Sequence, residues 1–404
     1  MGNAAVPRDT LRTLFLNAGH LYDHMFMLLF ATAVIALAPE FDLSYGVMLA
    51  YSTPAFVAFG AGALPAGWLG DRWSRAGMMV IFFVGIGLAS ILTGFARSAW
   101  QIGAGLLAIG VFASIYHPCG IAMLVEGRDK VGRLLGVNGL AGNMGVAAAG
   151  LVAGVLIDLV SWRAVFIVPG LVSVATGIAF ALFARSESRA GTLRKKEVPR
   201  AAVDRAVMVR VFTVIVIATT LGGLIFNATT VAMPKLMDDG VKSFLTGTSD
   251  IGLLVAAIFA VAAFSQILVG HLIDKHPVKP IFLICLTLQA PMLLLLTRLA
   301  DLPLFLGALL LMCLVFGQIP IMDTLIARHT ADKWRSRVYA VKYVLALGVA
   351  ASAVPLTGFL RDWSGSFAWV LGLMAVLAAI IAVAGLALPG AGRAAVPVPA
   401  AGDD

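Results

Sequence analysis

Charged residues are scarce in this chain of 404 residues. Only 12% of its residues are charged and 60% are hydrophobic, with a mean hydropathy of +0.97. A soluble domain carries about 25% charged residues and about 45–50% apolar ones. A water-exposed surface cannot be built from this mixture, so most of the chain must face lipid or other helices. The composition excludes a soluble globular protein.

Signals of other protein classes are also missing. The three cysteines, Cys119, Cys285 and Cys313, lie in apolar runs without metal-ligand spacing, so we predict no disulfide framework. A Gly-rich phosphate loop with its Lys is absent, which argues against an ATP-driven pump. No Ser/His/Asp arrangement or metal-ligand cluster suggests an enzyme. We expect a non-enzyme without a cofactor or metal site, and no nucleic-acid partner, because the net charge of +8 lies in short loops.

Long apolar runs alternate with short polar segments along the whole chain. A spanning helix needs roughly 20 apolar residues, and helices suit lipid because each satisfies its own backbone hydrogen bonds. We therefore predict an all-α membrane protein with twelve transmembrane helices in two six-helix bundles. The expected helices lie at approximately 14–38, 47–70, 77–95, 99–124, 134–157, 163–184, 210–234, 249–273, 280–298, 302–327, 338–360 and 366–388.

Two polar segments set the expected domain organisation. Residues 185–208 are polar and basic, and we interpret them as a cytoplasmic linker between an N-terminal bundle (1–184) and a C-terminal bundle (209–388). The segment 389–404, rich in Ala, Pro and Gly, predicts a disordered cytoplasmic tail. The first apolar run has no cleavage site followed by a soluble domain, so we expect it to be retained as a helix.

The loop charges orient the chain. With the N-terminus in the cytoplasm, the inside segments carry 22 Lys and Arg residues and the outside loops carry 6. Cytoplasmic loops of membrane proteins have such an excess of positive charge. We therefore expect a multi-pass protein of a bacterial inner membrane, with both termini in the cytoplasm.

The two halves repeat each other in equivalent loops. Gly67–Arg72 (GWLGDR), after the second expected helix, matches Gly270–Lys275 (GHLIDK), after the eighth, 203 positions later. Asp158, which closes the fifth helix, matches Asp362, which closes the eleventh, 204 positions later. Two matches at nearly one offset indicate parallel repeats, a layout found among secondary transporters.

The loop after the second helix resembles the signature of the major facilitator superfamily. Gly67 permits close helix packing, while Asp71 can meet a helix N-terminus or a loop Arg. Such contacts can form in one conformation and break in another, so we predict a gate, with a plain charged turn as the alternative. The predicted gating residues are Gly67, Asp71, Arg72 and Arg75, with Gly270 and Asp274 in the second half.

A narrower resemblance is to the fosmidomycin-resistance branch of bacterial efflux proteins. Three segments carry it: Gly19–His24 (GHLYDH), Tyr116–Pro118 (YHP) and Gly142–Gly145 (GNMG). Relatives have a Ser-His-x-x-Asn/Asp run, a Phe-His-Pro and a Gly-Asn-Phe-Gly at these places. The resemblance implies efflux and drug resistance, and it implies that His117 lines the transport cavity.

Three ionisable residues share one face of the first expected helix. His20, Asp23 and His24 stand at i, i+3 and i+4. An ionisable side chain inside a membrane costs about 2.5–3.5 kcal/mol on insertion scales, so it should face a cavity and a partner. Histidine titrates near physiological pH, which makes the set a candidate proton-coupling or substrate site. A structural cluster that pins the first helix to its neighbours is the alternative.

Other polar residues complete the candidate cavity. His117 precedes Pro118, which removes a backbone hydrogen bond and predicts a kink in the fourth helix; a packing histidine is the alternative. Lys342 places a cation in the second half, where it attracts an anionic substrate or extends to the surface. Asn143 is a further candidate for the cavity, and Asp323 either pairs with a loop cation or takes part in transport.

These features together predict a secondary transporter. We expect a monomeric, proton-coupled exporter of a small anionic or amphiphilic compound, working by alternating access in the lipid bilayer. A proton entering from outside would neutralise Asp23 or charge a histidine, and so release the substrate. The alternatives are a proton-coupled importer of an organic acid or metabolite, and a transporter-like membrane sensor, which would be expected to carry a larger cytoplasmic region.

Overall fold

The computed structural model describes residues 8–126, 132–187, 205–243, 245–329, 342 and 344–389, and the regular structure in these ranges is helical throughout. The first half comprises α1 (Arg8–Glu40), α2 (Tyr45–Ala50), α3 (Thr53–Arg72), α4 (Arg75–Gly94), α5 (Ala99–Ala113), η1 (Tyr116–Gly120), α6 (Ile121–Val125), α7 (Gly132–Leu159) and α8 (Trp162–Glu187). The second comprises α9 (Arg205–Gly240), α10 (Thr248–Lys275), α11 (Val278–Leu296), α12 (Asp301–His329), η2 (Val344–Gly348), η3 (Val349–Ser352), α14 (Ala353–Ser364) and α15 (Ala368–Gly385).

Eleven of the twelve predicted spans are confirmed as helices. Within the described ranges, eleven helical segments are long and apolar enough to cross a membrane. The remaining predicted span, 338–360, is described at Lys342 and from 344 onwards, where it forms η2, η3 and the start of α14. Most of the predicted linker (188–204) and nearly all of the predicted tail (390–404) lie outside the described residues. The chain is a multi-pass α-helical membrane protein.

Local sequence explains where several helices begin. Ser44, Ser74 and Ser98 precede α2, α4 and α5, and each side-chain oxygen accepts a hydrogen bond from a backbone N–H of the first turn. A serine at this position satisfies a donor that the helix itself leaves unpaired. Pro54 lies in the first turn of α3, which therefore begins as a new helix after α2.

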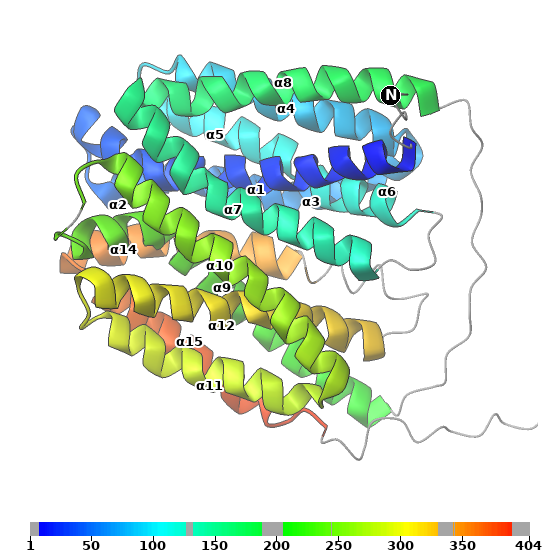
Figure 1. Ribbon diagram of the computed structural model, residues 1–404, viewed down its shortest axis with the longest axis vertical. Coiled ribbons are helices and arrows are strands. Elements are labelled where there is room, and N and C mark those ends of the chain that lie inside the picture. The colour runs from blue at the N-terminus through cyan, green and yellow to red at the C-terminus, as the bar shows by residue number, and fades with distance from the viewer. Residues whose placement is uncertain are drawn as a thin grey trace, which may run out of the picture.

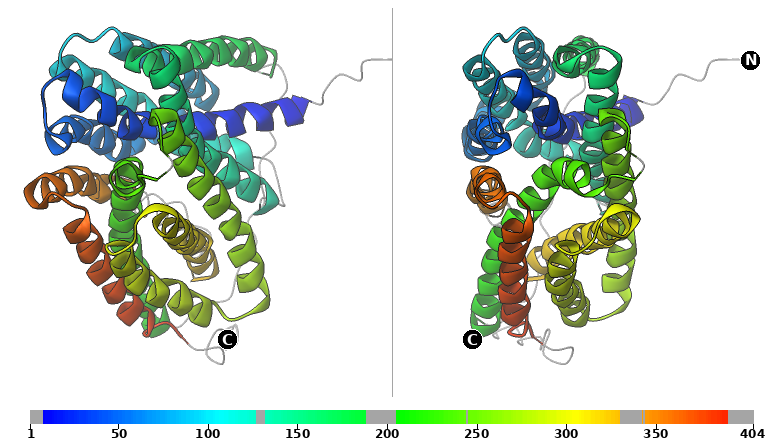
Figure 2. Two further views of the ribbon diagram at one scale, coloured as in Figure 1. Left: turned by 60° about the vertical axis from the view of Figure 1, so that its left-hand side comes forward. Right: turned by 90° about the vertical axis from the view of Figure 1, so that its left-hand side faces the viewer.

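The helices form two groups that lie side by side (Figure 1). α1, α3 to α8 and η1 make the upper group in this view, and α9 to α12, α14 and α15 make the lower one; two turned views keep this division (Figure 2). Within the groups, α1 packs on α7, α4 on α8, α10 on α12 and α11 on α15. α1 is the most deeply buried of the spanning helices described, so His20 and Asp23 in its middle face protein.

Several element pairs join the groups. α7 packs along α10 and α2 packs on α14, while α3 contacts η2 and η3, and α1 contacts α9. Many large apolar side chains on the outside of the bundle, such as Leu92, Trp100 and Val383, are more than 60% exposed. Such a surface suits lipid, where apolar exposure carries no cost.

Candidate functional site

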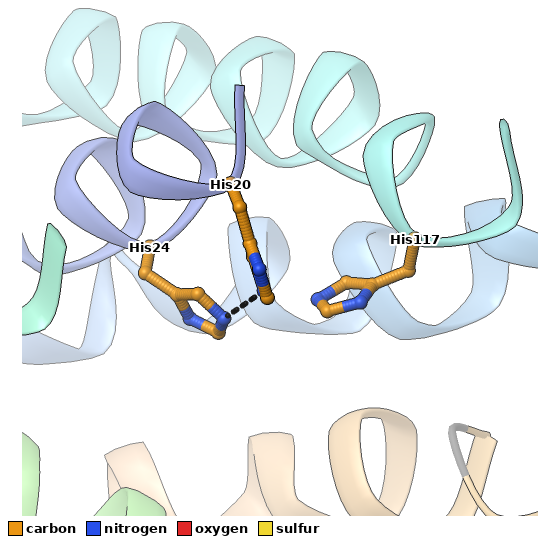
Figure 3. A group of neighbouring side chains, drawn as sticks. All are labelled: His20, His24 and His117. Carbon is orange, nitrogen blue, oxygen red and sulfur yellow. Dashed lines mark hydrogen bonds between the residues drawn. The ribbon is translucent and has the colours of Figure 1, made fainter. Parts of the chain in front are cut away.

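Three imidazoles from two helices meet in the first half. His20 and His24 lie one turn apart on α1, and His117 lies on η1 in the fourth span. Figure 3 shows the three rings turned towards one another, with segments of the second half on the facing side. Nε2 of His24 lies 3.2 Å from Nε2 of His20, and the His117 ring centroid lies 5.2 Å from that of His20. The predicted set on α1 is thus brought together with His117.

Asp23 lies beside this histidine cluster, which we define as His20, His24 and His117. Its side chain is 0% exposed, and its Oδ2 lies 3.3 Å from Nε2 of His117. Within the described part of the chain, neither carboxylate oxygen accepts a hydrogen bond. Burying an ionised carboxylate with so little compensation would cost several kcal/mol, and the role of Asp23 in coupling or cargo binding stays a prediction.

A break in the fourth span presents His117. The chain leaves α-helical geometry after α5 and makes the π-helical turn η1, which includes Pro118, where the sequence predicted a kink. Single π-helical turns inside α-helices are frequent at functional sites. Here the turn lets two successive residues face α1, because Tyr116 stacks on the His20 ring at 4.8 Å while His117 faces Asp23.

A hydrogen-bond network centred on Asn138 of α7 positions His20 and Tyr116. Nδ1 of His20 lies 2.7 Å from the backbone oxygen of Asn138 on α7. The Asn138 side chain donates to Asn17 at 3.0 Å and to the Tyr116 hydroxyl at 2.8 Å, and that hydroxyl donates to the Leu16 carbonyl at 2.8 Å. Asn138 was only one of several polar positions in the sequence. Asn138 lies one turn before Gly142, so the two residues share a face of α7. This shared face is the sequence feature that could have identified Asn138.

Gly142 makes room for the His20 ring. A Cβ added at Gly142 would lie 2.6 Å from Nε2 of His20. Asn143, the next residue, is buried, but among the described residues no hydrogen bond connects its side chain to the imidazoles. The predicted GNMG segment therefore contributes space at Gly142, and a role for Asn143 in the cavity stays a prediction.

Lys342 lies in the second half and pairs with Asp323 of α12. The Lys342 side chain is 11% exposed and that of Asp323 is 42% exposed. The sequence did not indicate this pairing, and a role for Lys342 in the cavity stays a prediction.

The predicted gating motif forms its contacts at the end of the bundle where α3 meets α4. Asp71 accepts hydrogen bonds from Nε and Nη2 of Arg75 at 3.1 and 2.5 Å. Glu126 accepts a hydrogen bond from Nη2 of Arg12 at 2.8 Å. Nη1 of Arg75 lies 3.8 Å from Glu126, so these charges form one network. We call this end of the bundle the Arg75 end. The network ties together helices of the first half.

The other motif residues lie at the same end. The Arg72 guanidinium lies over the Trp68 ring at 5.5 Å from its centroid. A Cβ added at Gly67 would lie 3.1 Å from Pro118, so close packing of α3 on η1 is the reason for that glycine. In the second half, Asp274 is exposed and a Cβ at Gly270 would meet nothing within 4 Å. The gating role of all six residues stays a prediction.

The opposite end, which we call the Asp158 end, is closed between the halves. Asp158 of α7 accepts hydrogen bonds from the backbone N–H groups of Thr248 and Ser249, at 3.2 and 2.7 Å, where α10 begins. Asp362 of α14 accepts from the Ser44 hydroxyl at 2.5 Å and from the Gly46 N–H at 2.8 Å, where α2 begins. The repeated aspartates thus make equivalent contacts in opposite directions. This role was not predicted for either residue.

Glycines distinguish the two ends. Near the Asp158 end, a Cβ added at Gly252 would lie 2.3 Å from the Gly150 oxygen, and one at Gly46 would lie 2.4 Å from the Gly358 oxygen. Towards the Arg75 end of α7, a Cβ at Gly136 or Gly139 would meet nothing within 4 Å. The halves are therefore in backbone contact at one end and apart at these positions near the other.

Comparisons with known proteins agree with this architecture. The family model described as Major Facilitator Superfamily matches residues 18–248 and again residues 215–402. A curated relative, a "Na(+), Li(+), K(+)/H(+) antiporter" of Planococcus maritimus, is 22% identical over 395 residues, covering 88% of this chain and 91% of the relative.

Two solved structures of a bacterial homologue of the human lysosomal transporter Spinster have a similar fold. The inward-facing unoccupied form gives a TM-score of 0.74 and the inward-facing occupied form 0.73, each at 14% identity and 95% coverage of both chains. At this identity the likeness shows the fold alone. The narrower resemblance to the fosmidomycin-resistance branch stays a prediction.

Proposed function

This chain belongs to the major facilitator superfamily and is a membrane transporter, and we propose that it exports a small cation in exchange for protons by alternating access. In this cycle the two groups of helices rock about the cluster, so that it opens to one side of the membrane at a time. The direction is supported by the resemblance of three first-half segments to efflux proteins.

The unequal ends of the bundle support the cycle. The halves touch through Asp158, Asp362 and glycine contacts at one end, while Gly136 and Gly139 of α7 face open space towards the other. Hydrogen bonds from a carboxylate to a helix N-terminus contribute about 0.3–2 kcal/mol each. Contacts of this size can form and break during a transport cycle. By the loop charges, the closed Asp158 end faces outward.

The position of the histidine cluster and Asp23 is the observation that carries the proposal. His20, His117 and Asp23 are buried and His24 is half-buried, and the three imidazoles lie on the side of α1 and η1 that faces the second half (Figure 3). Ionisable groups inside the membrane mark substrate and ion pathways, because placing them there costs free energy. Exchange against protons is supported by the name of the curated relative, an antiporter of alkali cations and protons.

The charges around the cluster favour a cation as cargo. The sequence suggested an anionic or amphiphilic compound because of Lys342, but Lys342 is paired with Asp323. Asp23 adds a second carboxyl group, so these three side chains offer two acidic groups and one basic group. Neutral imidazoles add lone pairs that attract cations.

The proposal is tested with purified full-length chain in liposomes that have an acidic interior and a pH-sensitive dye inside. Sodium, lithium, potassium, zinc and a phosphonate anion are added outside one at a time. A cation that the protein exchanges for protons raises the internal pH. The same pH change with an anion, or a cation that enters together with protons and acidifies the interior, would contradict cation–proton exchange.

Substitutions connect the transport to the site. Asp23→Asn should reduce the exchange at least tenfold, because it removes the carboxylate beside the histidine cluster. Asp42→Asn is the matched control: Asp42 lies outside the helices with φ 52°, a conformation that Asn tolerates. Equal exchange by the two variants would exclude Asp23 from the transport site.

A further inference from the structure

We propose that His20, His24 and His117 bind a divalent first-row transition-metal ion of the zinc class, and that this ion is the cargo. That the ion is the cargo rests on the proposed function, whereas binding of the ion rests only on the geometry of the histidine cluster. The sequence predicted no metal site, because His117 follows His24 by 93 residues and only the fold brings them together.

The spacing of the ring nitrogens suits one ion. One nitrogen from each histidine lies within 4.8 Å of the other two. Zinc binds imidazole nitrogen at about 2.0–2.1 Å, which places two ligands of a tetrahedral ion about 3.4 Å apart. Nε2 of His20 and Nε2 of His24 are already 3.2 Å apart. His117 then has to approach by about 1–1.5 Å, a movement within the reach of side-chain rotation.

Two histidines at i and i+4 are a known way to bind zinc from one helix face. His20 and His24 have this spacing on α1, and the π-helical turn η1 supplies the third ring from the facing helix. Three protein nitrogens leave a position open on a four-coordinate ion. An open position suits an ion that must enter and leave.

The hydrogen bond from His20 to Asn138 leaves Nε2 of His20 available to bind a metal ion. A backbone carbonyl can only accept a hydrogen bond, so the contact between Nδ1 of His20 and the Asn138 oxygen requires the proton on Nδ1. The lone pair of Nε2 is then directed towards the cluster. Metal-bound histidines almost always donate their other N–H in this way. The Asn138 network therefore fixes both the tautomer and the orientation of this ring.

Asp23 supplies negative charge next to the ion. Its Oδ2 lies 3.3 Å from Nε2 of His117, and its two oxygens accept no hydrogen bond from the described residues although the side chain is fully buried. A divalent cation in the cluster would compensate this carboxylate. The carboxylate also borders the ligand set, where it can complete or support the coordination of the ion.

The donor set determines which cation fits. Imidazole suits zinc, copper, nickel and iron, whereas magnesium and calcium prefer oxygen ligands. A site with three nitrogens and one nearby carboxylate should therefore favour zinc and cobalt over magnesium, calcium and the alkali ions. In this respect the chain is expected to differ from the curated relative named for sodium, lithium and potassium.

The binding test uses the purified full-length chain in detergent, carrying an affinity tag without histidine. Co²⁺ is the probe, because it binds like zinc and its visible absorption reports tetrahedral nitrogen ligation. We expect one Co²⁺ per chain, displaced by one Zn²⁺ and not by excess Mg²⁺ or Na⁺. His24→Ala and His117→Ala should each weaken Co²⁺ binding at least a hundredfold, and His24→Gln and His117→Gln replace them if the alanine variants fail to fold.

His276→Ala is the matched control, because His276 is exposed beside the end of α10. It should bind Co²⁺ like the unaltered chain. Binding that survives His24→Ala and His117→Ala, or that is lost in His276→Ala, overturns the site. Absence of binding up to millimolar Co²⁺ also overturns it, even if the liposomes exchange another cation for protons. Co²⁺ binding without proton exchange in liposomes would instead leave the site standing and reject the transport function.

Discussion

Asp158 and Asp362 hold equivalent places in the two halves, and each carboxylate caps a helix that belongs to the other half. Asp158 accepts from the backbone at the start of α10, and Asp362 accepts at the start of α2. In the proposed cycle, each hydrogen bond crosses the boundary that opens at this end. We therefore expect the pair to bias the equilibrium between the two states without any contact with the cargo.

Replacing both caps should open the Asp158 end. At about 1 kcal/mol for each cap, the double variant Asp158→Ala with Asp362→Ala shifts the population towards the opened state by about thirtyfold. The shift can be measured from the distance between spin labels at Val160 and Leu302, which are 69% and 54% exposed near this end. The labels require a background in which the three cysteines are replaced.

Glu40→Ala is the control for that experiment. Glu40 is an exposed carboxylate at the end of α1, near the same end of the bundle. It should leave the distance distribution unchanged. An identical distribution in the double cap variant would mean that the caps do not hold this end closed.

Gly252→Ala should prevent tight closure at the same end. The added Cβ would lie 2.3 Å from the backbone oxygen of Gly150, so α7 and α10 would have to separate. We expect a loss of about 1–3 kcal/mol in stability, measured as a lower thermal unfolding midpoint in detergent. Gly372→Ala on α15 is the control, because its Cβ would meet nothing within 4 Å. Equal midpoints would show that the contact relaxes at no cost.

Gly142→Ala should displace the His20 ring. Its added Cβ would lie 2.6 Å from Nε2 of His20, and the ring, not the backbone, is the part that can move. Transport and Co²⁺ binding should both fall at least tenfold, while the unfolding midpoint changes little. Gly372→Ala on α15, whose added Cβ would meet nothing within 4 Å, should keep full activity. If both variants stayed active, the position of His20 would not matter.

The pair of Asp323 and Lys342 should behave as a unit. Lys342→Gln or Asp323→Asn leaves one charge uncompensated, and each should cost about 1 kcal/mol, a moderate value because Asp323 is 42% exposed. The double variant should recover about 1 kcal/mol relative to the sum of the two. The free energies of unfolding of the unaltered chain, the two single variants and the double variant, measured by heat or denaturant, complete this double-mutant cycle. Additive losses would mean that the two charges do not interact.

Helix positions could be predicted from the sequence because a segment that crosses lipid has to be a long apolar helix. A run such as 249–273 is apolar along its length, and in the structure it lies within α10. The face of α1 that carries His20, Asp23 and His24 also followed from helical spacing, since periodicity determines which residues share a face. Both predictions depend only on residues that are close in sequence.

The rest of the site depends on which helices pack together, and no local pattern determines that. His117 was a candidate through resemblance, but its contact with Asp23 arises from the packing of the fourth span on α1. The role of Asn138 rests largely on a backbone oxygen, which every residue has. The charge of Lys342 suggested an anion, and no local pattern indicated that Asp323 would lie beside it.

The π-helical turn at Tyr116–Gly120 has the effect of one extra residue inserted into an α-helix of the fourth span. It holds more residues per turn than an α-helix, so the helix beyond it is rotated relative to the helix before it. Shortening this turn by a single residue would leave the span long enough for the membrane yet turn His117 away from its partners. Length and hydropathy would then look normal in a chain that has lost its site.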